Sequence, residues 1–249
     1  MKKIKIYILA LISIAILNSC GTPVDPQEVV NSQKLKSETK WQCNPDSKAK
    51  LFKVSYKEYT LEGKLLKSIN YNDFGVAASV SEIAYNDDEM IETENFIGSN
   101  GTSDSTVITT SKFDLTGKKV SLIESNLKGD TLSYSSFVYD NSGNLVKKIE
   151  LNSSTSKVSE VVYKNIYNDQ GQIVERLQDV IENNQFSTKE FINYLPDENK
   201  IRKITTDSFG SIININTYTF NGSGKIVIET IADNTGKVKK YFTYEYSYF

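Results

Sequence analysis

One short element recurs along most of this chain and restricts the folds available to it. The element is an aromatic residue, an Asx-rich turn, usually a glycine, and then an aliphatic strand, as in YDNSGNL at 139–145. The leading aromatics follow one another in steps of 26 to 28 residues. They are Tyr59, Tyr85, Phe113, Tyr139, Tyr167, Tyr194 and Phe220. A fixed period of this length is typical of a repeat architecture.

The composition of the turns follows from the backbone conformation that a tight hairpin requires. A second turn lies about midway between successive aromatics, so each unit holds two strands and two turns. Asn and Asp side chains bond to the backbone that follows them, and glycine adopts positive φ without a Cβ clash. A type I turn followed by a left-handed glycine closes a hairpin with a bulge. In the two irregular copies, Asn199 can take the left-handed position, whereas Glu89 predicts a distorted turn.

Between the turns the segments are rich in β-branched and aromatic residues with a period of two, which predicts strands. Neither face of segments such as 157–167 and 225–231 is uniformly apolar. We therefore expect an all-β fold, a repetitive antiparallel β-meander of about 14 strands in about seven hairpin units. Open twisted sheets seldom exceed roughly 10 strands, so this sheet should be twisted or curled. The predicted sheet domain spans residues 51–249.

The repeated element resembles the YD repeat of the RHS family, best at 139–145. The resemblance covers roughly residues 51–249. It implies a spiralling β-sheet, and repeats of this family have been linked to carbohydrate binding. The chain departs from the family pattern in its longer spacing, in frequent Asn for Asp, and in the rarity of Arg after the glycine. The shell that some RHS-type chains form around a toxin is therefore not expected here.

Residues 1–19 have the features of an export signal. Lys2, Lys3 and Lys5 precede an almost wholly apolar run at 6–17, which is shorter than the roughly 20 residues of a transmembrane helix. The run ends in Leu-Asn-Ser-Cys-Gly, which resembles the lipobox of bacterial lipoproteins. The resemblance implies cleavage before Cys20 and attachment of diacylglycerol and acyl chains such as palmitate there. A plain secretory signal and an uncleaved anchor helix are the alternatives.

Residues 20–50 are polar, contain three of the four prolines and show no sustained period. This composition predicts a lipidated N-terminus followed by a flexible tether. Removal of residues 1–19 leaves no polybasic patch, so attachment to a membrane would depend on lipid. With Cys20 acylated, Cys43 would have no intramolecular disulfide partner, and we expect an inert, partly buried thiol.

Composition excludes several classes of function. The 29 basic and 31 acidic residues are too balanced for a protein that binds nucleic acid through its phosphates. The chain has no histidine, so Ser-His-Asp and Cys-His nucleophiles and histidine metal sites cannot form. Paired carboxylates occur at 87–89 and 197–198, in turns where acidic residues are expected structurally. The turn at 100–104 is more simply a solvated loop than a calcium site. We expect no catalysis, cofactor or metal.

Two sets of aromatic residues could form a binding surface. The seven leading aromatics should align across the sheet, where packing that fixes strand register is the simpler role. The second set shares one face of the last predicted strand and would suit stacking on a sugar, although a strand that covers the core explains it as well. This second set is Phe242, Tyr244, Tyr246 and Tyr248.

The C-terminal Phe249 is a feature of outer-membrane barrels, but Ser247, Glu245 and Thr243 share its face. Lys and Glu on both faces of most strands would be costly against lipid. We therefore expect a β domain that is soluble and held to the membrane only by lipid.

Together these features predict a lipid-anchored, non-catalytic binding or structural module of the bacterial cell envelope, with a glycan or a protein as ligand. The outer membrane or the cell surface is the favoured location. A protective, immunity-type surface protein that neutralises a toxin is the alternative, and a glycoside hydrolase is less favoured. The sequence leaves the ligand, the oligomeric state and the membrane leaflet open.

Overall fold

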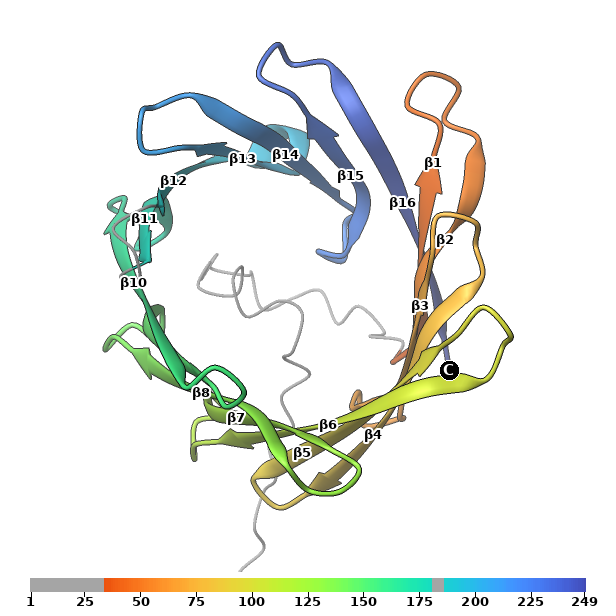
Figure 1. The fold of residues 1–249 in the computed structure, drawn as a ribbon. Coiled ribbons are helices and arrows are strands. Elements are labelled where there is room, and N and C mark those ends of the chain that lie inside the picture. Colours follow the sequence, from red (N-terminus) through yellow and green to blue (C-terminus); the bar gives the residue numbers. More distant parts are fainter. Residues whose placement is uncertain (1–33, 181–185) are drawn as a thin grey trace, which may run out of the picture.

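The protein folds into a single closed β-barrel, seen along its axis in Figure 1. The computed structural model describes residues 34–180 and 186–249. The strands, in chain order, are β1 (Leu35–Cys43), β2 (Lys50–Tyr59), β3 (Leu65–Tyr71), β4 (Ala77–Asn86), β5 (Glu89–Ile97), β6 (Ser103–Phe113), β7 (Lys119–Asn126), β8 (Thr131–Tyr139), β9 (Leu145–Asn152), β10 (Lys157–Tyr167), β11 (Ile173–Val180), β12 (Phe186–Leu195), β13 (Lys200–Thr206), β14 (Ile212–Phe220), β15 (Ile226–Ala232) and β16 (Val238–Tyr248). One short 3₁₀ helix, η1 (Pro196–Glu198), lies between β12 and β13.

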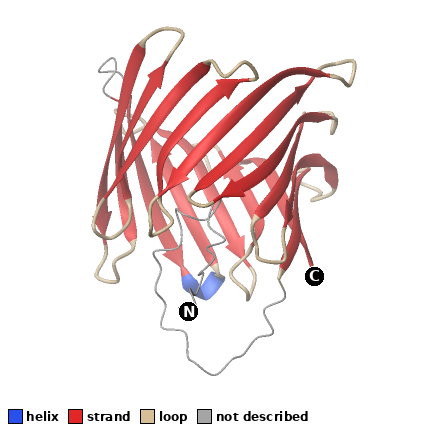
Figure 2. Cartoon of the chain, turned by 90° about the horizontal axis from the view of Figure 1, so that it is seen from below, coloured by secondary structure: helices blue, strands red, loops and turns tan. Residues whose placement is uncertain are grey.

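Each strand pairs antiparallel with its neighbours in the sequence, and β1 pairs with β16 to close the ring. The strands lie oblique to the barrel axis, and the C-terminus lies at the same end as η1 (Figure 2). At the closure, the backbone N–H of Phe249 donates to the carbonyl of Lys34 at 3.1 Å. Within the described ranges, no helix is both long enough and apolar enough to cross a membrane.

The repeated turns have the geometry that their composition predicts. In the β8–β9 turn, Asp140 Oδ1 accepts the backbone N–H of Asn144 at 2.8 Å, and Gly143 N–H donates to the Asp140 carbonyl at 3.0 Å. Gly143 has a φ of +85°. In the irregular β12–β13 copy, Asn199 takes the left-handed position with a φ of 50°, as predicted. The β4–β5 turn is shortened so that Glu89 begins β5 and Asp87 has positive φ.

The prediction of a twisted or curled meander of about 14 strands is wrong. The fold is all-β and antiparallel, but it is a closed barrel of sixteen strands. The two strands that the prediction lacks come from the two ends of the domain. Residues 35–43, inside the segment expected to be a tether, form β1, and Tyr246 on β16 continues the aromatic series 26 residues after Phe220. An eighth unit therefore completes the ring, and closure pairs the two strands that would otherwise be edges.

The eight units form two similar halves of the barrel. The aromatic order Tyr59, Tyr85, Phe113, Tyr139 repeats as Tyr167, Tyr194, Phe220, Tyr246. In each half the second unit has the irregular turn, and the third has phenylalanine in place of tyrosine. The sequence repeat thus has a longer period of four units, which places equivalent residues on opposite sides of the ring.

The predicted signal segment 1–19 and the lipidation site Cys20 lie outside the described residues. Cys43 lies within them, fully buried and without a disulfide, with its Sγ 3.4 Å from Thr243 Oγ1.

A candidate ligand site in the barrel lumen

The barrel encloses a cavity of about 2440 Å³ near one end. We call this end the aromatic mouth, because it is formed by the turns that follow the leading aromatics. Those turns are 60–63, 87–88, 114–117, 140–143, 168–171, 196–199 and 221–224. The aromatics that line the cavity are Tyr59, Tyr85, Phe113, Tyr194, Phe220, Tyr244 and Tyr246. The volume exceeds the roughly 300–1,000 Å³ of a typical small-molecule pocket, so the lumen has room for an oligomeric ligand.

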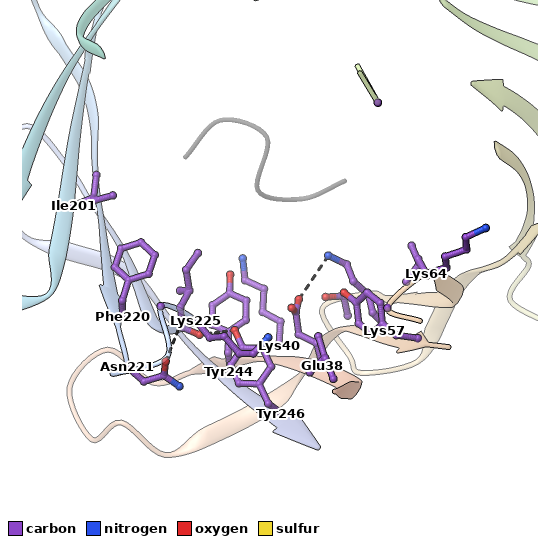
Figure 3. A pocket seen from close by; sticks show the side chains of 18 of the residues that line it. Glu38, Lys40, Lys57, Lys64, Ile201, Phe220, Asn221, Lys225, Tyr244 and Tyr246 are labelled. Carbon is purple, nitrogen blue, oxygen red and sulfur yellow. Dashed lines mark hydrogen bonds and ion pairs between the residues drawn. The ribbon is translucent and has the colours of Figure 1, made fainter. Parts of the chain in front are cut away.

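The cavity-lining residues of β1 and β16 show which faces of these strands form the inner wall. Glu38 and Lys40 on β1 and Tyr244 and Tyr246 on β16 line the cavity, and Figure 3 shows them along one stretch of wall. Because side chains alternate between the two faces of a strand, the register of the ladders extends this assignment around the ring. Four ion pairs then lie on the inner wall: Lys40–Glu229 at 2.7 Å, Lys57–Glu38 at 3.5 Å, Lys148–Glu150 at 2.5 Å and Lys203–Glu190 at 3.0 Å.

The most enclosed charged group on the inner wall is Glu229, which is 8% exposed. Its Oε2 accepts from Lys40 Nζ at 2.7 Å and from the Tyr244 hydroxyl at 2.5 Å. Lys40 Nζ also lies 4.1 Å from the ring centre of Phe242. Burial raises the pKa of Tyr244 well above its usual value, and the charge of Glu229 raises it further. Tyr244 therefore acts as a hydrogen-bond donor to the carboxylate at any ordinary pH.

Three of the leading tyrosines bind the neighbouring hairpin through their hydroxyls. Tyr139 donates to the carbonyl of Lys119 at 2.8 Å, and Tyr246 donates to that of Ile226 at 2.6 Å. Tyr194 makes the same bond to Ile173 at 3.2 Å. Each acceptor is the second residue after the glycine of the preceding turn. These three bonds, which we call tyrosine clamps, support the predicted role of the aromatics in fixing register.

Lysines cover three of the leading tyrosine rings. Lys64 Nζ lies 4.8 Å from the ring centre of Tyr85, and Lys225 Nζ lies 5.3 Å from that of Tyr246. Lys118 Nζ lies 5.7 Å from the ring centre of Tyr139. Each of these lysines directly follows the turn glycine of the preceding unit. A cation over the ring face is a favourable contact, and it leaves less of that face open to a ligand.

The residues predicted to stack on a sugar share the inner face of β16, as expected from their spacing. Tyr244 and Tyr246 line the cavity, while Phe242 is 6% exposed beneath Lys40 and Tyr248 is half-buried. The hydroxyls of Tyr244 and Tyr246 are engaged by Glu229 and by the Ile226 carbonyl. These four residues form one side of the lumen rather than an isolated platform, and their role in binding a sugar stays a prediction.

The carboxylates considered for catalysis lie in exposed turns on different sides of the mouth, apart from Glu89, which is half-buried at the start of β5. Asp87 and Asp88 are in the β4–β5 turn, and Glu198 in η1 pairs with Lys200 at 2.6 Å. In the turn at 100–104, Asn100 Oδ1 accepts the Thr102 backbone N–H at 3.0 Å. Among residues 34–180 and 186–249, no group of acidic or cysteine side chains is placed to hold a metal.

Sequence reasoning missed the inner-wall residues of β1, Glu38 and Lys40. The signal was present in the alternation of charged residues with Ser, Thr and Trp over residues 36–41, followed by the turn-forming Asn-Pro-Asp at 44–46. This segment lacks the aromatic and the glycine of the repeat, so the repeat pattern does not extend to it and its composition predicts a tether.

The outer wall is also polar and charged. Pairs on this face include Lys147–Glu160 at 2.8 Å and Lys189–Glu175 at 2.8 Å. Along the closure, Trp41 Nε1 donates to Glu245 Oε2 at 2.8 Å and the hydroxyls of Ser37 and Ser247 lie 2.7 Å apart. Charged groups thus occur around the barrel on both faces.

Comparison with known proteins supports the fold. No protein-family model and no curated protein matches the chain. A solved structure described as a porin-like protein from Bacteroides uniformis is similar, with a TM-score of 0.54 and 10% identity, over 86% of this chain and 98% of that chain. A porin-like protein from Bacteroides vulgatus matches with a TM-score of 0.45 and 12% identity, over 86% and 99% of the two chains.

A further match is the TcdB2-TccC3-Cdc42 structure, with a TM-score of 0.27 and 10% identity, over 78% of this chain and 15% of that chain. At TM-scores of 0.45 and 0.27, the second and third likenesses carry no argument. The likeness to the YD repeat therefore rests on the sequence motif alone and stays a prediction.

Proposed function

We propose that this protein is a non-catalytic binding barrel of the bacterial cell envelope, and that its ligand is a glycan held in the lumen at the aromatic mouth. The observation that carries the proposal is the lining of the cavity, where aromatic rings alternate with Lys, Glu and Asn side chains. Flat rings pack on the apolar faces of sugars, and the polar groups between them bond to sugar hydroxyls.

A glycan fits this barrel better than a protein that binds by strand addition. Strand addition needs an open sheet edge, and every one of the sixteen described strands is paired on both sides. A protective protein of the immunity type would therefore have to bind its toxin through the turns or the outer wall, without backbone pairing.

Attachment through lipid at Cys20 is part of the proposal. The outer wall supports a barrel that stands outside the bilayer, because pairs such as Lys147–Glu160 and Lys189–Glu175 face outward. A lysine facing lipid at the midplane of a membrane costs about 2–4 kcal/mol. The Cys20→Ser chain should move from the membrane to the soluble fraction on cell fractionation, and full retention in the membrane would refute the anchor.

A transmembrane pore is the second candidate, favoured by the closed sixteen-stranded barrel and its wide lumen. Conductance across planar bilayers separates the two candidates. We expect no channels from the purified full chain, since the outer wall is charged. Reproducible channels would favour the pore over a lipid-anchored binding barrel.

Glycan binding is tested with the purified full chain on an array of uncharged and acidic oligosaccharides. We expect saturable binding of at least one class, and competition by the same sugar free in solution. Failure to bind any glycan, together with intact barrel structure by circular dichroism, would refute the proposed function.

A further inference from the structure

Two of the eight leading aromatic positions are phenylalanines, Phe113 and Phe220. Both line the cavity, and both are half-buried. Phe113 ends β6 and Phe220 ends β14, which are eight strands apart in either direction around the ring. The two side chains therefore project from opposite sides of the aromatic mouth.

Both phenylalanines occupy the same place in the two halves of the barrel. Each follows the unit with the irregular turn, and its backbone N–H donates to a carbonyl of that turn. Phe113 bonds to Asp88 at 2.9 Å and Phe220 bonds to Asn199 at 2.8 Å. The irregular turns lack the glycine that precedes each carbonyl used by a tyrosine clamp.

The rings of Phe113 and Phe220 also lack the lysine covers seen elsewhere. In the part of the chain that the structure describes, no lysine or arginine lies over either ring, in contrast to Tyr85, Tyr139 and Tyr246. Figure 3 shows the Phe220 ring beside Ile201 at the cavity wall, with Lys225 next to it. A half-buried ring without a polar group or a cation over it is suited to the apolar C–H face of a sugar.

The charges of the inner wall indicate which kind of sugar is accommodated. The four inner-wall ion pairs already match each participating lysine with a carboxylate. At these four pairs, an acidic ligand would have to compete with a carboxylate for its lysine, and a basic ligand would have to compete with a lysine, each against the cost of separating a partly enclosed pair. Lys64 and Lys225, which line the cavity outside these pairs, lie over tyrosine rings. Hydroxyl groups can bond to the remaining acceptor and donor positions of these carboxylates and lysines without separating the pairs.

Glu38 and Lys57 show how such a contact would form. Their side chains are 18% and 25% exposed, and Glu38 Oε1 lies 3.5 Å from Lys57 Nζ, longer than the 2.7 Å of the Lys40–Glu229 pair. Both groups line the cavity. A carboxylate has about four acceptor positions, so Glu38 can accept sugar hydroxyls while it remains beside Lys57.

From these observations we infer that the ligand is an uncharged, hydroxyl-rich oligosaccharide, and that Phe113 and Phe220 are its two ring contacts on opposite sides of the aromatic mouth. The inference rests on the proposed function, because it specifies the class of glycan and the residues that bind it.

The test compares uncharged with acidic hexasaccharides by calorimetric titration of the purified full chain. The uncharged probes are the hexamers of glucose, mannose, xylose and N-acetylglucosamine, and the acidic probe is the hexamer of galacturonic acid. We expect binding among the uncharged probes and none of the acidic one. The Phe113→Leu/Phe220→Leu double variant keeps apolar bulk but loses both flat rings, and its affinity should fall about tenfold or more.

The matched control is Phe209→Leu, because Phe209 is 93% exposed in the β13–β14 turn at the opposite end of the barrel. Its affinity should equal that of the unmodified chain, and thermal unfolding should show that all variants fold. Binding of the acidic hexamer in preference to the uncharged ones, or unchanged affinity in the double variant, would overturn the inference while leaving glycan binding intact. If no uncharged or acidic probe binds, either on the array or in the titration, the proposed function itself is refuted.

Discussion

Lys40 and Glu229 on the inner wall and Lys147 and Glu160 on the outer wall form ion pairs of nearly equal length, 2.7 and 2.8 Å. The inner pair has side-chain exposures of 20% and 10%, and the outer pair has 35% and 31%. The inner carboxylate also accepts the Tyr244 hydroxyl. Geometry alone therefore does not set the energy of such a pair, because the surrounding solvent decides how much a lost partner costs.

The largest effect is expected from Lys40→Met, which leaves Glu229 partly enclosed without its cation. Loss of one partner of a buried pair typically costs about 3–5 kcal/mol, and the remaining exposure of Lys40 reduces our expectation to about 2–3 kcal/mol. Urea unfolding followed by circular dichroism measures the change. Adding Glu229→Gln should recover part of the loss. A cost below about 0.5 kcal/mol would mean that the two walls do not differ.

A smaller effect is expected when a tyrosine clamp is removed from the inner wall. Tyr246→Phe leaves the carbonyl of Ile226 without its side-chain donor and should lower the free energy of unfolding by about 1 kcal/mol. Tyr248→Phe, on the same strand, is the control, because no partner for the Tyr248 hydroxyl is present among the described residues. Equal destabilisation by both substitutions would show that the clamp bond itself contributes nothing.

The outer wall should respond least to the loss of a charge. Lys147→Met removes a pair that stays in contact with solvent, so the free energy of unfolding should change by about 0.5 kcal/mol or less. When the same urea titration is repeated at high salt, the free energies of unfolding of the two chains should differ no further, because salt screens the pair. A loss as large as that for Lys40→Met would contradict the comparison.

The stability of the folded protein should depend on pH through the aspartates of the turns, which lie at the rim between the inner and outer walls. The Thr116 side chain, followed by the backbone N–H of Lys118, holds the pKa of Asp114 below its usual value. Because the folded pKa is the lower one, the stabilisation is present above the unfolded pKa of about 4 and is lost as pH falls through the folded pKa. Asp114→Asn keeps the acceptor oxygen, so it should leave stability at pH 7 nearly unchanged.

NMR titration of the Asp114 carboxyl measures this pKa directly, and the Asp114→Asn chain should lose less stability than the unmodified chain between pH 5 and pH 2. Identical acid titrations of the two chains would contradict the assignment. Asn72 and Asn126 occupy the same turn position in other hairpins, and their Oδ1 atoms accept the same backbone bonds, so the fold already uses both residue types there.

Local rules predicted the hairpins well, because each turn carries its own signal. The Asx side chains, the left-handed glycines and the substitution of Asn199 all act within four or five residues, and the structure confirms them. Closure could not be predicted in this way. It depends on the pairing of Leu35 with Tyr248, more than 200 positions apart in the chain, for which no local motif exists.

The candidate site was only partly foreseen for the same reason. The inward face of β16 follows from alternation along one strand, so Phe242, Tyr244, Tyr246 and Tyr248 were correctly placed on one face. The partners of these residues, Lys40 on β1 and Glu229 on β15, become neighbours only when the ring closes. The contrast between clamped tyrosines and uncovered phenylalanines likewise needs the neighbouring hairpin in place.

The hydrogen bond between Phe249 N–H and the Lys34 carbonyl has a consequence for chain topology. Because the first and last strands lie side by side, a short linker could join them, and new ends could be opened in an exposed turn such as 127–130 without removing any strand pair. Such a circular permutant would retain the complete hydrogen-bonded ring. The barrel can therefore be regarded as a cycle of eight similar hairpin units, in which the position of the break determines where the chain leaves the fold rather than how the fold is built.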